Sequence, residues 1–267
     1  PYLYVGRGFA ELAWPYSDDE RTRERYQVME YPVGISYFAY AAAWITHATH
    51  GLPDTAARAA NSVAALGADP DVDQERSDYV ANSAILLGAT TLVAAWFLSR
   101  THRRRPWDAM LFAASPALVL NGLINWDLLA VALVAGATWA WARGKPVLTG
   151  VMIGVGTATK LYPLFLLGAL LVICLRRRAL ATFAKVSAVA AAAWLLTNLP
   201  AMLTGWDEWK VFWSFNSERG ADLGSFWLVL SQAGTQFSAE AINTASWIFF
   251  IAWCVGVLII GMAAPST

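Results

Sequence analysis

The feature that most constrains the fold is a single lysine inside a long apolar run. Residues 147–175 carry no charge other than that of Lys160, while Arg143 and Lys145 precede the run and three arginines, 176–178, follow it. Basic residues collect on the cytoplasmic side of a membrane, so both ends of the run are predicted to lie there. The chain must then turn back near Lys160. Each arm of about 15 residues would be roughly 22 Å long against a hydrocarbon core of roughly 30 Å, which places the turn inside the membrane.

The composition is typical of a polytopic membrane protein. Hydrophobic residues make up 57% of the chain and charged residues 14%, and the mean hydropathy is +0.44. The net charge is zero, so a nucleic-acid partner has no electrostatic support and is excluded. We predict an all-α integral membrane fold in contact with membrane lipids. Residues 32–267 would form one multi-span helical bundle with re-entrant or broken helices, and residues 1–31 the remainder of a non-cytoplasmic loop.

Apolar segments and basic clusters together predict the path of the chain. The clusters at 103–105, 143–145 and 176–178 are assigned to the cytoplasmic side. The polar interruption at 125–127, the turn at Lys160 and the loop 204–227 then all face the opposite side. The predicted spans are 79–99, two within 107–141, the hairpin around Lys160, 183–202 and 247–262, and a surface helix is expected within 55–67 of the acidic loop 51–78.

The first apolar segment, residues 32–49, does not fit this alternation. A full span there would place residues 1–31 on the cytoplasmic side, away from the other polar loops. Either the segment is re-entrant, or the loop 51–78 contains a further membrane pass, or one basic cluster breaks the rule. The sequence leaves these three alternatives open.

Asp127 is the leading acidic candidate for a functional role. It follows Asn125 and Trp126 between two apolar segments. As a functional residue it would orient or deprotonate a hydroxyl group, or pair with Lys160. The alternative is helix capping, in which an Asp or Asn side chain accepts hydrogen bonds from the free backbone N–H groups at the start of 128–141. The two roles are compatible.

Lys160 is the leading basic candidate. A lysine at bilayer depth costs roughly 2.5–3.5 kcal/mol on insertion scales and usually marks a site. We expect it to neutralise a phosphate, as a point charge on a flexible stem. The alternatives are snorkelling towards headgroups and a purely structural ion pair with Asp127. Gly154 and Gly156 do not belong to a nucleotide-binding loop, because Gly-Lys-Ser/Thr is absent and no strand precedes them. They are predicted to let helices pack closely.

Two further charged residues are candidates. Arg219 lies in the polar stretch 216–222 and is predicted to contact phosphate through its planar fork, although an ordinary loop ion pair with Glu218 or Asp222 is an equal alternative. Glu30 offers a carboxylate at the entrance to the first apolar segment. The three histidines lack ligand-like spacing, so no histidine metal site is expected. No cofactor is predicted, and a requirement for a divalent metal is left open.

A series of short motifs, in this order and spacing over roughly residues 2–230, resembles glycosyltransferase family 87, a group of polyprenyl-phosphate-mannose-dependent membrane mannosyltransferases. Each motif is short, so the resemblance depends on their order. The motifs are Glu30-Tyr31-Pro32, Arg104-Arg105-Pro106-Trp107-Asp108, Ser115-Pro116-Ala117, the stretch 123–130, Thr159-Lys160-Leu161-Tyr162-Pro163-Leu164 with the triple arginine after it, Arg219-Gly220 and Ser225-Phe226-Trp227.

The resemblance implies a C-type glycosyltransferase fold in the plasma membrane, with an active site on its periplasmic or extracellular side. Such enzymes transfer a sugar with inversion from a polyprenyl-phosphate-linked donor, and a first-loop aspartate removes the proton of the acceptor hydroxyl. Mannose is the expected hexose, and a lipid or a glycan the expected acceptor. Tyr2-Leu3-Tyr4 with Arg7-Gly8 resembles the part just after that aspartate. We therefore expect the base to lie before Pro1, and this fragment, truncated at both ends, to be inactive by itself.

The residues and the resemblance together define an expected site. Lys160 and Arg219 would stabilise the donor phosphate, and Asp127 would support catalysis by positioning the acceptor or Lys160. The other expected substrate contacts are Arg7, Glu30, Asn125 and Tyr162.

Two other classes of function compete with this interpretation. Broken membrane helices with a lysine and an aspartate near the midplane also describe an ion-coupled transporter or flippase, which would show inverted-repeat symmetry that we do not detect. A non-catalytic membrane scaffold would use the same two residues only as a structural pair. It would tolerate replacing both of them with apolar side chains.

Overall fold

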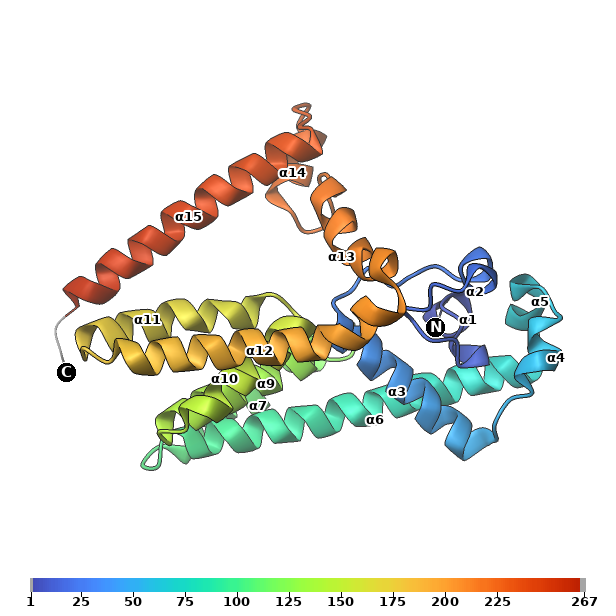
Figure 1. Ribbon diagram of the computed structural model, residues 1–267, viewed down its shortest axis with the longest axis horizontal. Helices are drawn as coiled ribbons and strands as arrows, with labels where there is room; N and C mark the ends of the chain where they lie inside the picture. The colour runs from blue at the N-terminus through green and yellow to red at the C-terminus, as the bar shows by residue number, and fades with distance from the viewer. Residues whose placement is uncertain (1, 265–267) are drawn as a thin grey trace.

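The computed structural model describes residues 2–264 and is helical throughout, as the sequence predicts (Figure 1). Three helices are long and apolar enough to cross a membrane, by length and composition: α6 (Pro70–Thr101), α12 (Leu180–Thr204) and α15 (Ala239–Ala263). Two shorter apolar helices, α10 (Pro146–Thr159) and α11 (Leu166–Arg176), form the predicted hairpin around Lys160. Pro1 and residues 265–267, which the predicted domains 1–31 and 32–267 include, lie outside the described residues.

The remaining helices are mostly short and lie around these five. The stretch 55–67 forms two helices rather than one, because Ser62 starts a second helix by accepting a hydrogen bond from the Ala65 N–H. The elements are α1 (Tyr2–Gly6), η1 (Phe9–Glu11), α2 (Glu20–Arg25), α3 (Val33–His50), α4 (Thr55–Ala59), α5 (Val63–Gly67), η2 (Pro106–Ala109), α7 (Met110–Ala113), α8 (Pro116–Asn121), α9 (Asp127–Ala142), η3 (Tyr162–Phe165), α13 (Trp206–Glu218) and α14 (Phe226–Gln232).

Helix α6 begins nine residues earlier than the predicted span 79–99, so residues 70–78 of the predicted loop 51–78 are helical. Asp69 caps the helix by accepting a hydrogen bond from the Asp71 N–H, and Pro70 occupies the first turn, where its missing N–H costs nothing. Asp71 and Asp73 place negative charge at the positive end of the helix dipole. The acidic residues that suggested a loop therefore stabilise a helix start.

The prediction of a continuous span in the first half of 107–141 is wrong. The chain there forms η2, α7 and α8, none longer than six residues, before α9 begins at Asp127. Pro106 and Pro116 each start a new short helix, because proline has no N–H to donate and fits only the first turn. The result is a broken segment beside α6 and α9, and it leaves the start of α9 accessible.

The centre of the bundle is the packing of α10 on α12. A Cβ added to Gly154 would lie 2.2 Å from the Ala190 carbonyl oxygen, and one added to Gly150 would lie 2.7 Å from that of Val186. The backbones therefore approach as closely as glycine allows, which confirms the predicted role of Gly154 in packing. A core cluster of Ile153, Val186, Ala190, Ala137 and Leu170 surrounds this contact and joins α9 and α11 to it. The hairpin that carries Lys160 is thereby fixed in the bundle.

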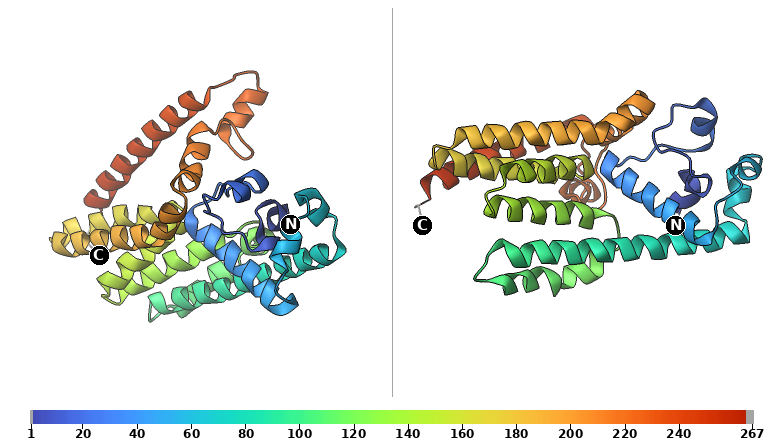
Figure 2. Two further views of the ribbon diagram at one scale, coloured as in Figure 1. Left: turned by 45° about the vertical axis from the view of Figure 1, so that its right-hand side comes forward. Right: turned by 60° about the horizontal axis from the view of Figure 1, so that its bottom comes forward.

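The basic clusters meet at one end of the bundle. Arg143 donates a hydrogen bond of 2.7 Å to the carbonyl oxygen of Arg100, and Arg176 donates one of 2.8 Å to that of Gly261. At the other end, the indole N–H of Trp14 donates to the Thr204 hydroxyl at 2.7 Å. Figure 2 shows the helices between the two ends running side by side, with the N-terminal segment gathered at the end away from the basic clusters.

Helix α3 does not run from one end of the bundle to the other. Its first turn packs against the end of α10, where a Cβ on Gly34 would lie 2.4 Å from the Thr159 hydroxyl oxygen. Its last residue, His50, pairs through Nδ1 with Asp78 of α6 at 3.0 Å, at the end that carries the N-terminal segment. Residues 2–31 thus lie at the same end as Thr204. The three alternatives for the membrane path of this segment stay predictions.

The last three helices stand partly away from the bundle (Figure 1). Trp209 of α13 donates a hydrogen bond of 2.8 Å to the Asn198 side chain of α12, which fixes the start of α13. The ring of Phe250 in α15 lies 5.2 Å from that of Phe165 in η3. Apart from the contact of Phe250, most of the apolar surface of α15 is exposed, as expected for a helix that faces hydrocarbon.

Candidate active site

The centre of the candidate site is an ion pair between two helix ends. Nζ of Lys160 lies 2.6 Å from Oδ1 of Asp127, although the two residues come from opposite ends of the α9–α10 pair in the sequence. Asp127 is the first residue of α9, and Lys160 is the residue directly after α10. The side chains remain 43% and 29% exposed, respectively. The pair is therefore accessible to a ligand.

Local backbone structure explains why both charges are tolerated there. The amide oxygen of Asn125 accepts a hydrogen bond of 3.1 Å from the Asp127 N–H, the first N–H of α9, so Asn125 rather than Asp127 satisfies a free backbone donor at this helix start. The carboxylate of Asp127 sits at the positive end of the α9 dipole, and the ammonium of Lys160 at the negative end of the α10 dipole. Each helix end thus favours the charge that it carries.

Aromatic rings from the segment before α3 and from the residue before α9 also border the ion pair. The ring of Tyr31, which precedes α3, lies 5.6 Å from Lys160 Nζ and forms a cation–π contact. The ring of Trp126 meets that of Tyr31 edge to face at 6.1 Å. The segment before α3 therefore reaches the turn after α10, and the first apolar segment contributes to the site.

Arg7 and Glu30, two predicted substrate contacts, form an ion pair of 2.7 Å with each other. Arg7 also donates to the carbonyl oxygen of Val28, and its side chain is 9% exposed. The pair holds the segment that carries Tyr31. Their position beside Tyr31 places them next to the candidate site, while their contacts are those of a structural support.

Tyr162 lies two residues after Lys160, at the start of η3, and is partly exposed. It therefore belongs to the same turn as the ion pair. Arg219 instead lies beyond the end of α13 and pairs with Asp222 of its own loop, with Nε 2.7 Å from Oδ2. The phosphate contact predicted for Arg219 stays a prediction, and its contacts in the structure are those of the alternative, a local loop pair.

Two grooves approach the ion pair. One of about 310 Å³ is lined mostly by apolar side chains of α10, η3, α11, α12 and α13, and it reaches Leu161. The other, of about 430 Å³, is bordered by the broken segment and the start of α9, including Asp127. Between α12, α13 and the segment before α3, an aromatic cleft contains Trp194, Trp209 and Trp213 with Leu161. Asp127 thus lines one of these grooves, and Lys160 precedes Leu161, which lines the other groove and the cleft.

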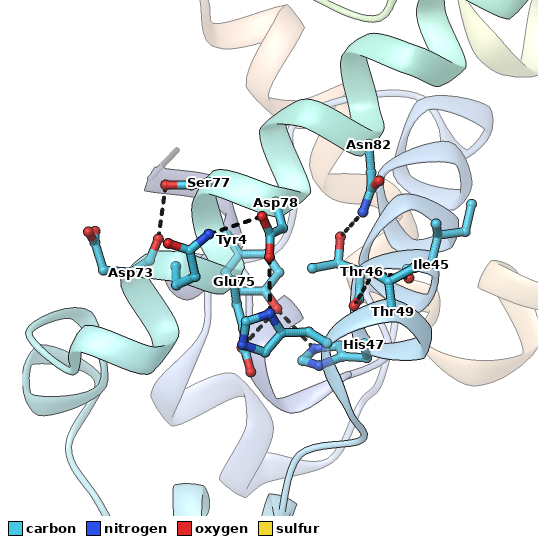
Figure 3. Close-up of polar contacts among 12 residues, drawn as sticks. Tyr4, Ile45, Thr46, His47, Thr49, Asp73, Glu75, Ser77, Asp78 and Asn82 are labelled. Atoms are coloured by element: carbon cyan, nitrogen blue, oxygen red, sulfur yellow. Dashed lines mark hydrogen bonds and ion pairs between the residues drawn. The ribbon is translucent and has the colours of Figure 1, made fainter.

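The sequence interpretation missed a buried polar network in the N-terminal part (Figure 3). The Tyr4 hydroxyl donates to Glu75 at 3.1 Å and lies 3.0 Å from His47 Nε2, which is also 3.0 Å from the Phe9 carbonyl oxygen. Arg58 makes a two-pronged pair with Glu75 at 2.6 and 2.9 Å. Burial raises the pKa of the Tyr4 hydroxyl above its ordinary range. These contacts connect α1, α3, α4 and α6, while the buried His47 Nδ1 has no hydrogen-bond partner within residues 2–264.

Residues 2–264 contain no group of three or more His, Cys, Asp or Glu side chains arranged to hold a metal ion. The groups that the described side chains supply at the ion pair are an ammonium and a carboxylate beside aromatic rings. Such a pair can bind an anion through Lys160 and accept a hydrogen bond from a hydroxyl group through Asp127.

Comparison with known families gives one match. The family model described as glycosyltransferase family 87 matches residues 76–265, more than half of the chain, and the matched region contains Asn125, Asp127, Lys160, Tyr162 and Arg219. Searches of curated proteins and of solved structures found no match. The broken segment, the ion pair and both grooves lie within the matched residues. The chain therefore belongs to glycosyltransferase family 87.

Proposed function

We propose that the complete protein transfers a hexose, mannose first among the candidates, from a polyprenyl-phosphate-linked donor to an acceptor outside the cytoplasm, with inversion at the anomeric carbon. Family membership supports sugar transfer as the reaction. The observation that carries the choice of donor is the position of Lys160. It is a partly exposed ammonium at the turn of an apolar hairpin, and the next residue, Leu161, lines an apolar groove. An anionic headgroup on a long hydrocarbon chain combines the two properties that this position accommodates.

In this mechanism the acceptor hydroxyl oxygen attacks the anomeric carbon as the bond from that carbon to the phosphate oxygen breaks. The hydroxyl proton passes to a carboxylate base, and the lipid phosphate leaves with the bonding electrons. Phosphate is a good leaving group, so no separate acid is needed. Lys160 stabilises the negative charge that develops on the departing phosphate, in surroundings where water screens it poorly.

Asp127 has a positioning role in this proposal. Its carboxylate holds Lys160 Nζ at 2.6 Å before the donor binds, and Tyr31 limits the movement of the ammonium from the other side. When a phosphate takes over Lys160, the freed carboxylate is available to the acceptor hydroxyl. The catalytic base in this proposal is a further aspartate, as the family resemblance implies, and not Asp127.

Sugar transfer is tested with the complete protein in membranes from cells that lack it, supplied with labelled polyprenyl-phosphate-mannose. Label should move to a lipid or glycan acceptor. Saturable uptake of a solute into proteoliposomes, with no transfer of label, would replace the proposal by a transporter. Family membership weighs against that outcome.

A further inference from the structure

The basic end of the bundle carries a groove that the proposed reaction does not use. This groove has a volume of about 370 Å³ and lies between the starts of α10 and α12, which pack side by side (Figure 1). None of its lining residues borders the two grooves or the aromatic cleft near Lys160, which follows the other end of α10. The groove is therefore separate from the candidate active site. Its lining residues are Lys145, Pro146, Val147, Leu148, Val151 and Lys185.

The two lysines that line this groove lack an acidic partner. The other two lysines of the chain, Lys160 and Lys210, each lie 2.6 Å from an aspartate. Within residues 2–264, by contrast, no carboxylate pairs with Lys145 or Lys185, and both side chains are exposed. The ammonium of Lys145 instead lies 5.1 Å from the ring of Trp139, in a cation–π contact. Both positive charges are thus available to an anion.

The surroundings of the groove are strongly basic. The segments 100–108, 143–145 and 176–185, which meet at this end of the bundle, contain a single acidic residue, Asp108. That carboxylate already pairs with Arg105 at 3.1 Å. A ligand of net negative charge is therefore attracted to this end, whereas a zwitterionic ligand would bring an ammonium close to like charges.

The walls of the groove and the surface beyond it are apolar. Val147 and Val151, one turn apart on α10, remain 47% and 36% exposed. On α12, the face that carries Lys185 continues through small side chains to Leu196, which is 67% exposed. Leu196 lies three helical turns beyond Lys185, or about 16 Å, which is close to half of a hydrocarbon core of roughly 30 Å. A ligand whose headgroup contacts the lysines therefore has apolar surface for a hydrocarbon chain.

We propose that this groove binds a phospholipid of net negative charge, with its headgroup phosphate between Lys145 and Lys185 and an acyl chain along α10 and α12. Basic pockets between membrane helices on the cytoplasmic side bind such headgroups, and the basic clusters predict that side for this end. Each lysine keeps its aliphatic stem against the apolar walls and presents its ammonium to the phosphate. A soluble phosphate would meet the same charges but would leave the apolar surface uncovered. Binding of this lipid does not depend on sugar transfer.

The test measures binding of phosphatidylglycerol and phosphatidylcholine, with identical acyl chains, to the complete protein in detergent by native mass spectrometry. The anionic lipid should bind about 25-fold more tightly, because each lysine near a lipid headgroup should contribute about fivefold in affinity. Lys145→Met with Lys185→Met should abolish this preference, while Lys145→Arg with Lys185→Arg should keep it. Equal binding of the two lipids by the unaltered protein would overturn the inference.

Arg103→Met with Arg104→Met is the matched control. It removes two exposed positive charges from the same end of the bundle, but neither arginine lines the groove. This variant should keep the preference for phosphatidylglycerol. The same loss of preference in both methionine variants would show general attraction to the basic end, and the assignment to the groove would be wrong.

A second readout locates the lipid. Phosphatidylglycerol with a photoreactive diazirine in one acyl chain should cross-link to α10 and α12, and millimolar inorganic phosphate should not reduce this cross-link. Cross-links confined to other helices would overturn the assignment. Displacement of the lipid by inorganic phosphate as effectively as by unlabelled phosphatidylglycerol would show a site for a soluble anion instead.

Discussion

The ion pair of Lys160 and Asp127 joins two residues that were singled out because each interrupts an apolar segment. Taking two charges out of water costs several kcal/mol per ion, and their attraction offsets this only with good geometry. Here both side chains stay partly exposed, and both sit at the helix end that favours their charge. The arrangement lowers the desolvation free energy of the ion pair and leaves the Lys160 ammonium accessible to a phosphate.

Replacing the two residues separates catalysis from structure. Asp127→Asn should reduce transfer about 100-fold, because a misplaced Lys160 no longer meets the departing phosphate. The double variant Asp127→Leu with Lys160→Met should remain folded and be as inactive as either single variant. Label transfer and thermal unfolding in detergent measure the two effects. Full activity of the double variant would support the scaffold interpretation instead.

The sequence identifies functional candidates only where a residue differs in character from its neighbours along the chain. Lys160, Asp127 and Asn125 stand out as polar groups in apolar runs, and the structure brings them together. Arg219 has an equally strong local signal, but its nearest partner, Asp222, is also local. The pairing of Tyr4 with His47 and Glu75 spans 43 and 71 positions. Nothing near Tyr4 in the sequence indicates those partners, because only the folded chain brings them close.

At the scale of single helices, the long apolar elements were predictable and the broken ones were not. The hairpin of α10 and α11 follows from its basic flanks and apolar arms. Residues 106–126 are equally apolar, so hydropathy predicts a span there, while Pro106 and Pro116 decide the structure by starting new short helices. Hydropathy alone therefore misses the broken segment that precedes α9.

The contact between α10 and α12 gives a test of packing. Gly154→Val should destabilise the protein by about 1–3 kcal/mol, because its side chain would collide with the backbone at Ala190. Gly168→Ala in α11 is the matched control, since a Cβ there meets nothing within 4 Å. Alanine in a helix interior should be neutral or stabilising by about 0.5–1 kcal/mol. Thermal unfolding in detergent measures both, and equal stability of the two variants would contradict the packing described.

At the scale of the whole molecule, the N-terminal segment of residues 2–31 packs against one end of the bundle and covers it. It is attached through Trp14 to Thr204, through Tyr31 to Lys160 and Trp126 at the ion pair, and through Tyr4 to Glu75. The sequence left the side of this segment open because the number of passes before α6 was unknown. Contacts at both ends of α3 and of Trp14 show only which end of the bundle the segment covers, the end that carries Thr204.

Removing Arg58 should loosen this cover. Arg58→Met leaves the carboxylate of Glu75, which is 3% exposed, without its ionic partner, and should cost about 3 kcal/mol. Arg105→Met removes an exposed pair with Asp108 and should change stability by less than about 0.5 kcal/mol. Limited proteolysis of residues 2–31 and thermal unfolding measure the difference. Equal behaviour of the two variants would show that the network does not hold the segment.

High pH should release the same segment. Burial raises the pKa of Tyr26 from 10.0 to about 12, and raises those of Tyr4 and Tyr16 still further. The folded state therefore keeps these protons to higher pH than the unfolded state does. Their contribution to stability is complete below about pH 10 and is lost as the pH rises through about 12. Proteolysis of residues 2–31 should accelerate in step with tyrosinate absorbance. Titration of all tyrosines near pH 10 without loss of protection would contradict their burial.

The contact of Lys160 with the donor phosphate is the claim on which the account of function depends most. The direct measurement is transfer of labelled mannose from polyprenyl-phosphate-mannose by the complete protein carrying Lys160→Met, beside Arg103→Met as a control from the exposed, basic end of the bundle. The first variant should lose about 100- to 1000-fold in kcat at unchanged expression, as expected when one group that stabilises developing charge is removed. The second should transfer at the unaltered rate. Full activity of Lys160→Met would contradict the assignment of Lys160 to the donor phosphate.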